Sequence, residues 1–264
     1  MPQIGVTDLY VEQAGEGSPV VLLHEGIGDS RMWEPQWESY AERFRVVRFD
    51  MRGFGQSPPA IGTFSLSGDL VELLDGLDLG PVTLIGMSLG GAVAIETTIA
   101  RPDLVSRLVL VGSGLRGFEM NDETKAGWEE EEAALERGDD DEAVEINMRM
   151  WVDGPSRSPD QVDPELRRKI GEMQRRAIDL WRESGEEDGD HQPLAEDWGE
   201  RLREISVPTL ILVGELDRPE MLEIAERLEA EIPNARRETI ADTAHVANME
   251  RPEEFDRLVL DFLS

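Results

Sequence analysis

The sequence predicts an α/β protein: a mostly parallel sheet with helices on both faces and a helical insertion. Three observations support this fold class. Short apolar runs alternate with amphipathic helical patterns, the runs are apolar on both faces, and they stop between about 118 and 203. Strands that are apolar on both sides are typical of a parallel sheet buried between two helix layers. A chain of 264 residues can bury one sizeable core, so we expect one α/β domain with an insertion.

Short apolar runs mark the strands of this sheet. Five of them are predicted as parallel strands: VVLLH at 20–24, FRVVRFD at 44–50, VTLIGM at 82–87, SRLVLVG at 106–112 and TLILVG at 209–214. The opening segment IGVTDLYVEQAG instead alternates apolar with polar residues, and the turn signal EGSP follows it. We therefore expect this segment to form a strand at the antiparallel edge of the same sheet.

Helices are predicted in the gaps between these runs. The segment 65–79 begins with Ser65 or Ser67 as a candidate N-cap, and the segment 219–231 begins with a proline, which is favoured in the first helical turn. A third segment, 251–263, opens with the residues RPEEF. Each segment shows one apolar stripe at helical spacing, so we expect each to pack one face on the sheet.

Residues 118–203 are predicted to be a helical lid, and residues 1–117 with 204–264 are predicted to form the α/β core. The insertion reads as helix, helix, turn-rich loop and helix. Ligands of parallel sheets bind at the carboxyl ends of the strands, where an insertion can cover the cleft. A disordered acidic linker is the alternative, but the segment holds too many large apolar residues for it. These residues are Met148, Met150, Trp151, Ile170, Met173, Ile178, Leu180 and Trp181.

The composition excludes several classes of function. The chain has no cysteine, which rules out thiolate nucleophiles and cysteine-bound metals, and three histidines are too few for a histidine metal cluster. We therefore expect neither a metal nor another cofactor. The net charge of −31 repels phosphate backbones and anionic lipids, so neither nucleic acid nor a membrane is an expected partner. The first residues show no signal peptide, and no long apolar run follows, so we expect a soluble cytoplasmic protein.

The pentapeptide GMSLG at 86–90 places Ser88 between a predicted strand and a predicted helix. That context is typical of a nucleophile elbow, a strained strand-to-helix turn that exposes a serine hydroxyl. Side chains two residues before and after the serine would collide in such a turn, and both positions are glycine here. The pattern therefore predicts Ser88 as a nucleophile.

Several further motifs resemble the α/β-hydrolase family, over most of the chain outside 118–203. They are HEGIGDSRMW at 24–33, FDMRGFGQS at 49–57, GMSLGG at 86–91, GELDRP at 214–219 and ADTAHVANMERPEEF at 241–255. They occur in the order oxyanion loop, nucleophile, acid and base. Several motifs in order are far more specific than one, and the resemblance implies an α/β-hydrolase fold with a Ser-Asp-His triad.

The resemblance implies that His245 is the general base and Asp217 the acid that orients it. His245 lies in a polar loop after the strand-like run RRETI, and Asp217 follows the strand TLILVG. In this arrangement the acid accepts the Nδ1 proton and leaves Nε2 free for the serine proton. Glu215 is the competing acid. Of the remaining candidates, His24 is interpreted as a scaffold residue that hydrogen-bonds neighbouring backbone, His191 as exposed, and Asp50 as a support for its loop.

By resemblance, the oxyanion hole consists of the backbone amides of Gly26 and Leu89. The loop departs from the family's pattern, because Glu25 stands where glycine usually follows the histidine. A carboxylate that faced the hole would oppose the developing negative charge. We therefore expect Glu25 to point away, toward solvent or toward an arginine such as Arg52.

A serine at the elbow indicates attack on a carbonyl carbon, because fold relatives that use aspartate there alkylate a carboxylate. The leading hypothesis is hydrolysis of a carboxylic ester or lactone through an acyl-enzyme on Ser88. A small neutral substrate is expected, because the negative field disfavours anions. It would occupy an apolar cavity under the lid, and four residues are candidates to line that cavity: Trp33, Met87, Met148 and Trp151.

Other functions remain open on the sequence alone. Within the fold, the alternatives are a carbon–carbon bond hydrolase, a hydrolase of the 3-oxoadipate enol-lactone type, or a cofactor-free perhydrolase that uses the same triad. A non-catalytic small-molecule receptor is the alternative from another class. Such a receptor does not require a triad, so the presence of all three residues argues against it.

Overall fold

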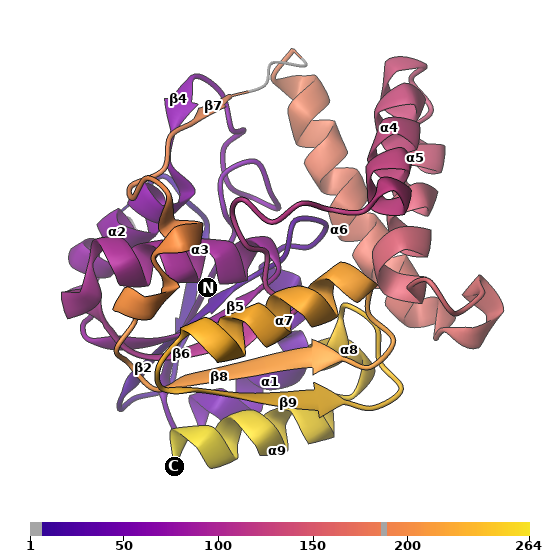
Figure 1. Ribbon diagram of the computed structural model, residues 1–264. Helices are drawn as coiled ribbons and strands as arrows, with labels where there is room; N and C mark the ends of the chain where they lie inside the picture. Colours follow the sequence, from indigo (N-terminus) through magenta and orange to yellow (C-terminus); the bar gives the residue numbers. More distant parts are fainter. Residues whose placement is uncertain (1–6, 186–188) are drawn as a thin grey trace.

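A seven-stranded sheet forms the centre of the computed structural model, which describes residues 7–185 and 189–264 (Figure 1). Its order is β1-β3-β2-β5-β6-β8-β9, with β1 antiparallel to β3 and every other neighbouring pair parallel. The strands are β1 (Val11–Ala14), β2 (Pro19–Leu23), β3 (Arg45–Phe49), β5 (Val82–Met87), β6 (Val105–Val111), β8 (Thr209–Gly214) and β9 (Ala235–Ile240). The predicted fold class, the five parallel strands and the antiparallel edge strand are confirmed.

Two hydrophobic clusters bury the two faces of the sheet, as the strand pattern requires. Val21 and Leu23 of β2 belong to one cluster, and Val20 and Leu22 to the other. This alternation follows from the two-residue period of a strand. Helices α2 (Leu66–Gly76), α3 (Leu89–Ala100) and α7 (Pro219–Glu231) contribute to the first cluster, and α1 (Glu34–Ala41) and α9 (Pro252–Leu263) to the second.

The helices begin at the N-cap and proline residues that the sequence indicated. The Ser65 hydroxyl accepts a hydrogen bond from the Gly68 amide at 3.1 Å, so Ser65 is the N-cap of α2. Prolines occupy the first residues of α7 and α9. The sequence pattern did not single out α1, the short α8 (Ala247–Glu250) or the 3₁₀ turns η1 (Ser30–Trp33) and η2 (Pro102–Leu104), because elements this short show little periodicity.

Residues 122–183, called the cap below, lie between β6 and β8 in the chain. They comprise α4 (Asp122–Glu136), α5 (Asp140–Asn147), the π-helix η3 (Met148–Asp153), the 3₁₀ turn η4 (Pro159–Gln161) and α6 (Pro164–Glu183). In Figure 1 these helices stand beside one another on the side to which the arrowheads of β8 and β9 point. The cap therefore lies at the carboxyl edge of the sheet, where parallel sheets bind ligands.

The chain returns from the cap to the core through the segment 189–204. There β7 (Asp190–His191) pairs with β4 (Thr63–Phe64), and η5 (Trp198–Glu200) and η6 (Leu202–Glu204) follow. Trp198 and Leu202 are buried in the same cluster as α2 and α3, and His191 is exposed as predicted.

In the part of the chain that the structure describes, no helix is long and apolar enough to cross a membrane.

Candidate active site

Ser88 lies in a strained turn between β5 and α3. Its backbone has φ +50° and ψ −111°, a conformation that few residues other than glycine adopt. A Cβ atom on Gly86 would lie 2.3 Å from the Gly90 carbonyl oxygen, and one on Gly90 would lie 2.5 Å from the Leu23 carbonyl oxygen. The predicted reason for glycine at both positions is therefore confirmed: no side chain fits inside this turn.

The strain at position 88 leads to a prediction about stability. We expect the Ser88→Gly variant to unfold with a free energy about 1 kcal/mol higher than that of Ser88→Ala. Positive-φ strain of roughly 1–3 kcal/mol is relieved in the glycine variant and is only partly offset by its more flexible unfolded chain. Urea unfolding of the two variants measures the difference. Equal unfolding free energies would show that the turn is not strained.

The structure brings His245 and Asp217 into direct contact. The His245 Nδ1 lies 2.9 Å from the Asp217 Oδ2, and both side chains are buried. The other Asp217 oxygen accepts the backbone N–H of Arg218 at 2.8 Å. Gly112, at φ +47°, packs against the pair, because a Cβ there would lie 3.0 Å from the Nδ1. The imidazole is thus held in one orientation from two sides.

The environment of His245 favours its protonated form. Burial lowers the pKa of this imidazole, but the Asp217 carboxylate and, to a smaller extent, Glu25 raise it, and the net direction is upward. The Trp151 ring lies 4.8 Å from the imidazole, centroid to centroid. Aspartate on one side and an aromatic ring on the other thus enclose the histidine.

The competing candidates occupy other places. Glu215 is exposed, and its carboxylate accepts the backbone N–H of Asp242 at 3.2 Å, so it does not contact His245. The ring nitrogens of His24 bond the Glu25 carbonyl at 2.7 Å and the Met51 amide at 2.9 Å, in agreement with a scaffold role. Asp50 accepts the amides of Ser30 and Gln56, both at 2.8 Å, and so holds its loop as expected.

Gly26 and Leu89, the two predicted oxyanion-hole residues, lie side by side. A Cβ on Gly26 would be 3.9 Å from the Leu89 Cβ. Leu89 is the first residue of α3, so its N–H has no acceptor one turn earlier in the helix. The dipole of α3 also favours negative charge at this end. The start of α3 therefore favours negative charge beside Ser88, and Gly26 lies next to it.

A cavity of about 220 Å³ lies between the core and the cap, and Ser88 and His245 both line it. Its other lining residues are Glu25, Gly26, Ile27, Trp128, Glu131, Asn147, Trp151 and Gln174. Of the predicted pocket residues, only Trp151 is among them. The prediction for Trp33, Met87 and Met148 is wrong: all three are buried in the second hydrophobic cluster. Met87 directly precedes the serine on β5, so its side chain points to the other face of the sheet, and Trp33 packs on Phe255 of α9.

The expected orientation of Glu25 is also wrong. Its side chain is 1% exposed, and its Oε2 lies 3.9 Å from the His245 Nε2, while Arg52 pairs with Asp8 and Asp69. Neither Glu25 oxygen has a hydrogen-bond partner among the described residues. Burial raises the pKa of Glu25 to about 7. The expectation assumed a permanent carboxylate, whereas protonation lets this side chain remain buried beside the histidine.

Three polar residues of the cap line the cavity without having been predicted: Glu131, Asn147 and Gln174. The Asn147 amide donates to the Glu131 Oε1 at 2.6 Å, and the Gln174 amide reaches the same oxygen at 3.4 Å. Burial raises the pKa of Glu131. Glu131 belongs to the acidic run EEEE at 129–132, a pattern typical of a solvent-exposed helix face. Its spacing of three residues from Trp128 is the sequence feature that could have indicated its position, because this spacing places both residues on one side of α4.

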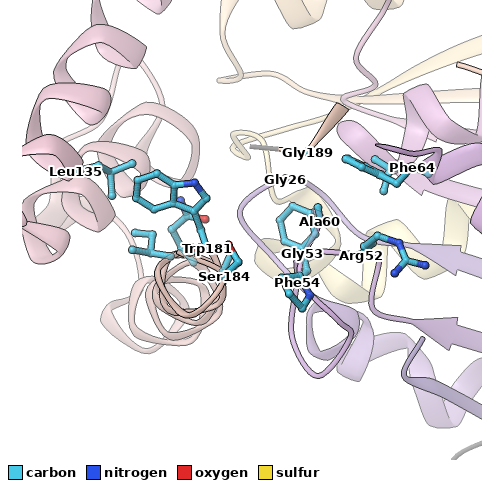
Figure 2. A pocket seen from close by; sticks show the side chains of 15 residues that line it. Gly26, Arg52, Gly53, Phe54, Ala60, Phe64, Leu135, Trp181, Ser184 and Gly189 are labelled. Atoms are coloured by element: carbon cyan, nitrogen blue, oxygen red, sulfur yellow. Dashed lines mark hydrogen bonds between the residues drawn. The ribbon is translucent and has the colours of Figure 1, made fainter. Parts of the chain in front are cut away.

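A second, apolar cavity of about 360 Å³ adjoins the first and shares Gly26 and Gln174 with it. In Figure 2, Trp181 and Leu135 of the cap face Phe54, Ala60 and Phe64 of the core across this space. The two cavities together offer a small polar compartment at the serine and a larger apolar compartment next to it.

Comparison with known proteins agrees with this architecture. A family profile described as the alpha/beta hydrolase fold matches residues 19–252. The chain belongs to the α/β-hydrolase family. This α/β-hydrolase is 28% identical to the 2-hydroxy-6-oxononadienedioate/2-hydroxy-6-oxononatrienedioate hydrolase of Paraburkholderia xenovorans, over 98% of this chain and 92% of that protein. It is 25% identical to 3-oxoadipate enol-lactonase 1 of Acinetobacter baylyi, over 94% and 90% of the two chains.

Solved structures of other α/β-hydrolases superpose on most of the chain. A thermophilic esterase from Thermogutta terrifontis gives a TM-score of 0.78 at 28% identity, covering 97% of this chain and 92% of that one. The relatives thus include an esterase, an enol-lactonase and a hydrolase of an oxo-diene diacid. They support hydrolase function on small molecules and leave the type of bond open.

Proposed function

We propose that this protein hydrolyses a carboxylic ester or lactone through an acyl-enzyme on Ser88. One observation carries the proposal: a serine in a strained elbow shares a cavity with His245, whose Nδ1 is 2.9 Å from the Asp217 carboxylate. A carboxylate on Nδ1 fixes the tautomer in which Nε2 can accept the serine proton. The nucleophile and the base therefore line one cavity, and the acid contacts the base, as this proposal of acyl transfer requires.

In this proposal each residue has one role. Ser88 attacks the substrate carbonyl, and His245 takes the serine proton and returns it to the leaving group. Water then attacks the acyl-enzyme, with His245 again as the base. The amides of Gly26 and Leu89 stabilise the oxyanion of both tetrahedral intermediates, and each donor is worth on the order of 10²–10³ in rate. No step requires a metal or another cofactor.

We further propose that residues 118–203 act as a lid. Five of the ten residues that line the serine cavity come from the cap: Trp128, Glu131, Asn147, Trp151 and Gln174. A cover over this cavity would limit the access of bulk water to the reacting atoms, which would strengthen the electrostatic interactions there. The lid residues would thus select the substrate, and the core residues would perform the chemistry.

Hydrolysis of a carbon–carbon bond is the second candidate, because the relative from Paraburkholderia xenovorans is a hydrolase of an oxo-diene diacid. The serine cavity argues against a diacid. Among the described residues that line it, there is no arginine or lysine to pair with a carboxylate. Perhydrolysis would use the same residues and differ only in the nucleophile that resolves the acyl-enzyme.

A fluorophosphonate probe tests the proposed function. We expect one adduct on the wild-type chain, found by intact mass spectrometry, and none on Ser88→Ala, because only an activated serine attacks the probe. A panel of esters and lactones of graded size then measures turnover, with Ser88→Ala as the control. An unlabelled wild-type protein that also leaves every ester intact would contradict the proposal and favour a binding protein.

A further inference from the structure

The serine cavity contains buried hydrogen-bond acceptors that have no donor. Both oxygens of Glu25, which both accept when its carboxyl group is ionised, and the Oε1 of Gln174 are buried without a partner among the described residues. The Gln174 Nε2 is directed to Glu131, a carboxyl group that accepts when ionised, so the remaining Gln174 atom is the acceptor. Buried acceptors without donors are costly and rare in native proteins. A ligand that donates several hydrogen bonds would satisfy all of them.

The charge of the same cavity is one-sided. Glu25 and Glu131 both line it, and no arginine or lysine is found among its described lining residues. Arg218 lies near, with its guanidinium 5.9 Å from the Trp151 ring, but its Nε donates to Thr124 and it does not line the cavity. Two carboxyl groups in a low-dielectric site that no arginine or lysine lines favour a positively charged ligand.

Aromatic rings complete this environment. Trp128 and Trp151 line the cavity together with the two glutamates. The faces of indole rings attract cations, and tryptophan does so best among the aromatic side chains. A primary ammonium group offers three donors and no acceptor, which matches both the orphaned acceptors and the rings. The net charge of −31 also concentrates cations near the protein.

We propose that the substrate of this hydrolase carries a primary ammonium group that binds to Glu25 and Glu131 beside the scissile carbonyl. This inference rests on the proposed function of the same site. The position beside the carbonyl follows from Glu25, whose Oε2 is 3.9 Å from the His245 Nε2. The apolar part of the substrate occupies the adjoining cavity of about 360 Å³. The selected class is therefore a small amino ester, and diacids are excluded by repulsion.

Three esters that differ only in the terminal group of the acid chain test the selectivity: the benzyl esters of β-alanine (ammonium), butanoic acid (methyl) and succinic acid (monoester, carboxylate). Benzyl alcohol release is followed by chromatography at pH 7.5 and constant ionic strength. We expect kcat/KM for the ammonium ester to exceed that for the butanoate by about tenfold or more, since charge-assisted hydrogen bonds are strong, and the succinate to be slowest. A second pair of esters, 2-aminoethyl phenylacetate and propyl phenylacetate, tests a substrate whose ammonium group lies on the alcohol side of the ester.

Two variants of α4 distinguish the effect of a carboxylate in the cavity from the effect of the protein's overall negative charge. Glu131→Gln is expected to reduce the ratio of kcat/KM for ammonium to neutral ester about tenfold. Glu132→Gln removes the same charge from the exposed neighbouring position and should leave the ratio unchanged. Equal rates for the ammonium and neutral esters of both pairs, or the same fall in ratio for both variants, would overturn the proposal.

A binding measurement tests the ammonium site independently of the proposed hydrolase function. Calorimetric titration of Ser88→Ala with propylammonium and with propanoate requires no turnover. Saturable binding of the amine that weakens in Glu131→Gln supports the ammonium site even if no ester is hydrolysed. Absence of amine binding, or tighter binding of propanoate, would overturn it even if neutral esters are turned over.

Discussion

Asp217→Asn is expected to lower kcat for any ester substrate by about 10⁴-fold while the fold remains intact. Asparagine would present its amide N–H₂ group to the His245 Nδ1 and stabilise the tautomer whose Nε2 carries the proton. That tautomer cannot accept the proton of Ser88. The imidazole ring cannot rotate away from residue 217, because Gly112 packs against its Nδ1 and Trp151 lies against the ring. Steady-state kinetics with a chromogenic ester measures the loss.

Glu215→Gln is the matched control for this prediction. It removes a carboxylate two residues away in the same loop, but Glu215 is exposed and bonded to the Asp242 amide. We expect its kcat to stay within about threefold of the wild type, because surface substitutions away from the site have small effects. A large loss in Glu215→Gln with a small loss in Asp217→Asn would exchange the roles of the two acids.

Glu25→Gln is expected to stabilise the protein increasingly as the pH rises. The pKa of Glu25 is about 7 in the folded protein and 4.5 ordinarily, so the folded state binds this proton more tightly than the unfolded chain does. That contribution is complete below about pH 4.5 and is lost as the pH rises through 7. Glutamine cannot ionise. Relative to pH 4.5, the variant should therefore gain about 3 kcal/mol of unfolding free energy over the wild type by pH 8.

The same substitution should change the pH profile of activity. The base must be neutral to act, and the Glu25 carboxylate is one of the groups that raise the pKa of His245. In Glu25→Gln the acidic limb of kcat/KM should therefore move to lower pH, with the largest gain relative to the plateau near pH 7, where the Glu25 carboxyl group of the wild type ionises. Urea unfolding and ester kinetics between pH 5 and 8 measure both effects.

Glu220→Gln provides a control of opposite sign. Burial raises the pKa of Glu220, but the Thr124 hydroxyl and backbone amides that bond it outweigh burial and lower the pKa overall. Its contribution to stability is therefore present at neutral pH and lost as the pH falls, so this variant should lose stability relative to the wild type as the pH rises. A Glu25→Gln difference that is independent of pH would show that the Glu25 carboxyl titrates normally.

The local parts of the site could be predicted because each depends on a short stretch of chain. The elbow follows from glycines at 86 and 90 around Ser88, since any Cβ there would meet backbone within 2.5 Å. The predicted pairing partner of His245 is in place because both residues follow strands whose carboxyl ends meet at one edge of the sheet. Continuous apolar runs likewise predicted strands that are buried on both faces.

The cavity could not be predicted, because its walls come from segments far apart in the sequence. Met87 is adjacent to the serine in the chain but points to the opposite face of the sheet, whereas Glu131 is 43 positions away and lines the cavity with it. The direction of a side chain near a strand end depends on the pleat and on which helix packs above it.

By itself, the sequence of this protein determined which segments form strands, where the elbow lies and which residues are available for acyl transfer. These features depend on residue type and spacing. Only the tertiary structure decided that Glu25 is buried beside His245 and that Glu131 lines the same cavity, which has no arginine or lysine among its described lining residues. The physical reason is that burial sets the protonation of a carboxyl group, and burial is a property of the packed fold rather than of the residue.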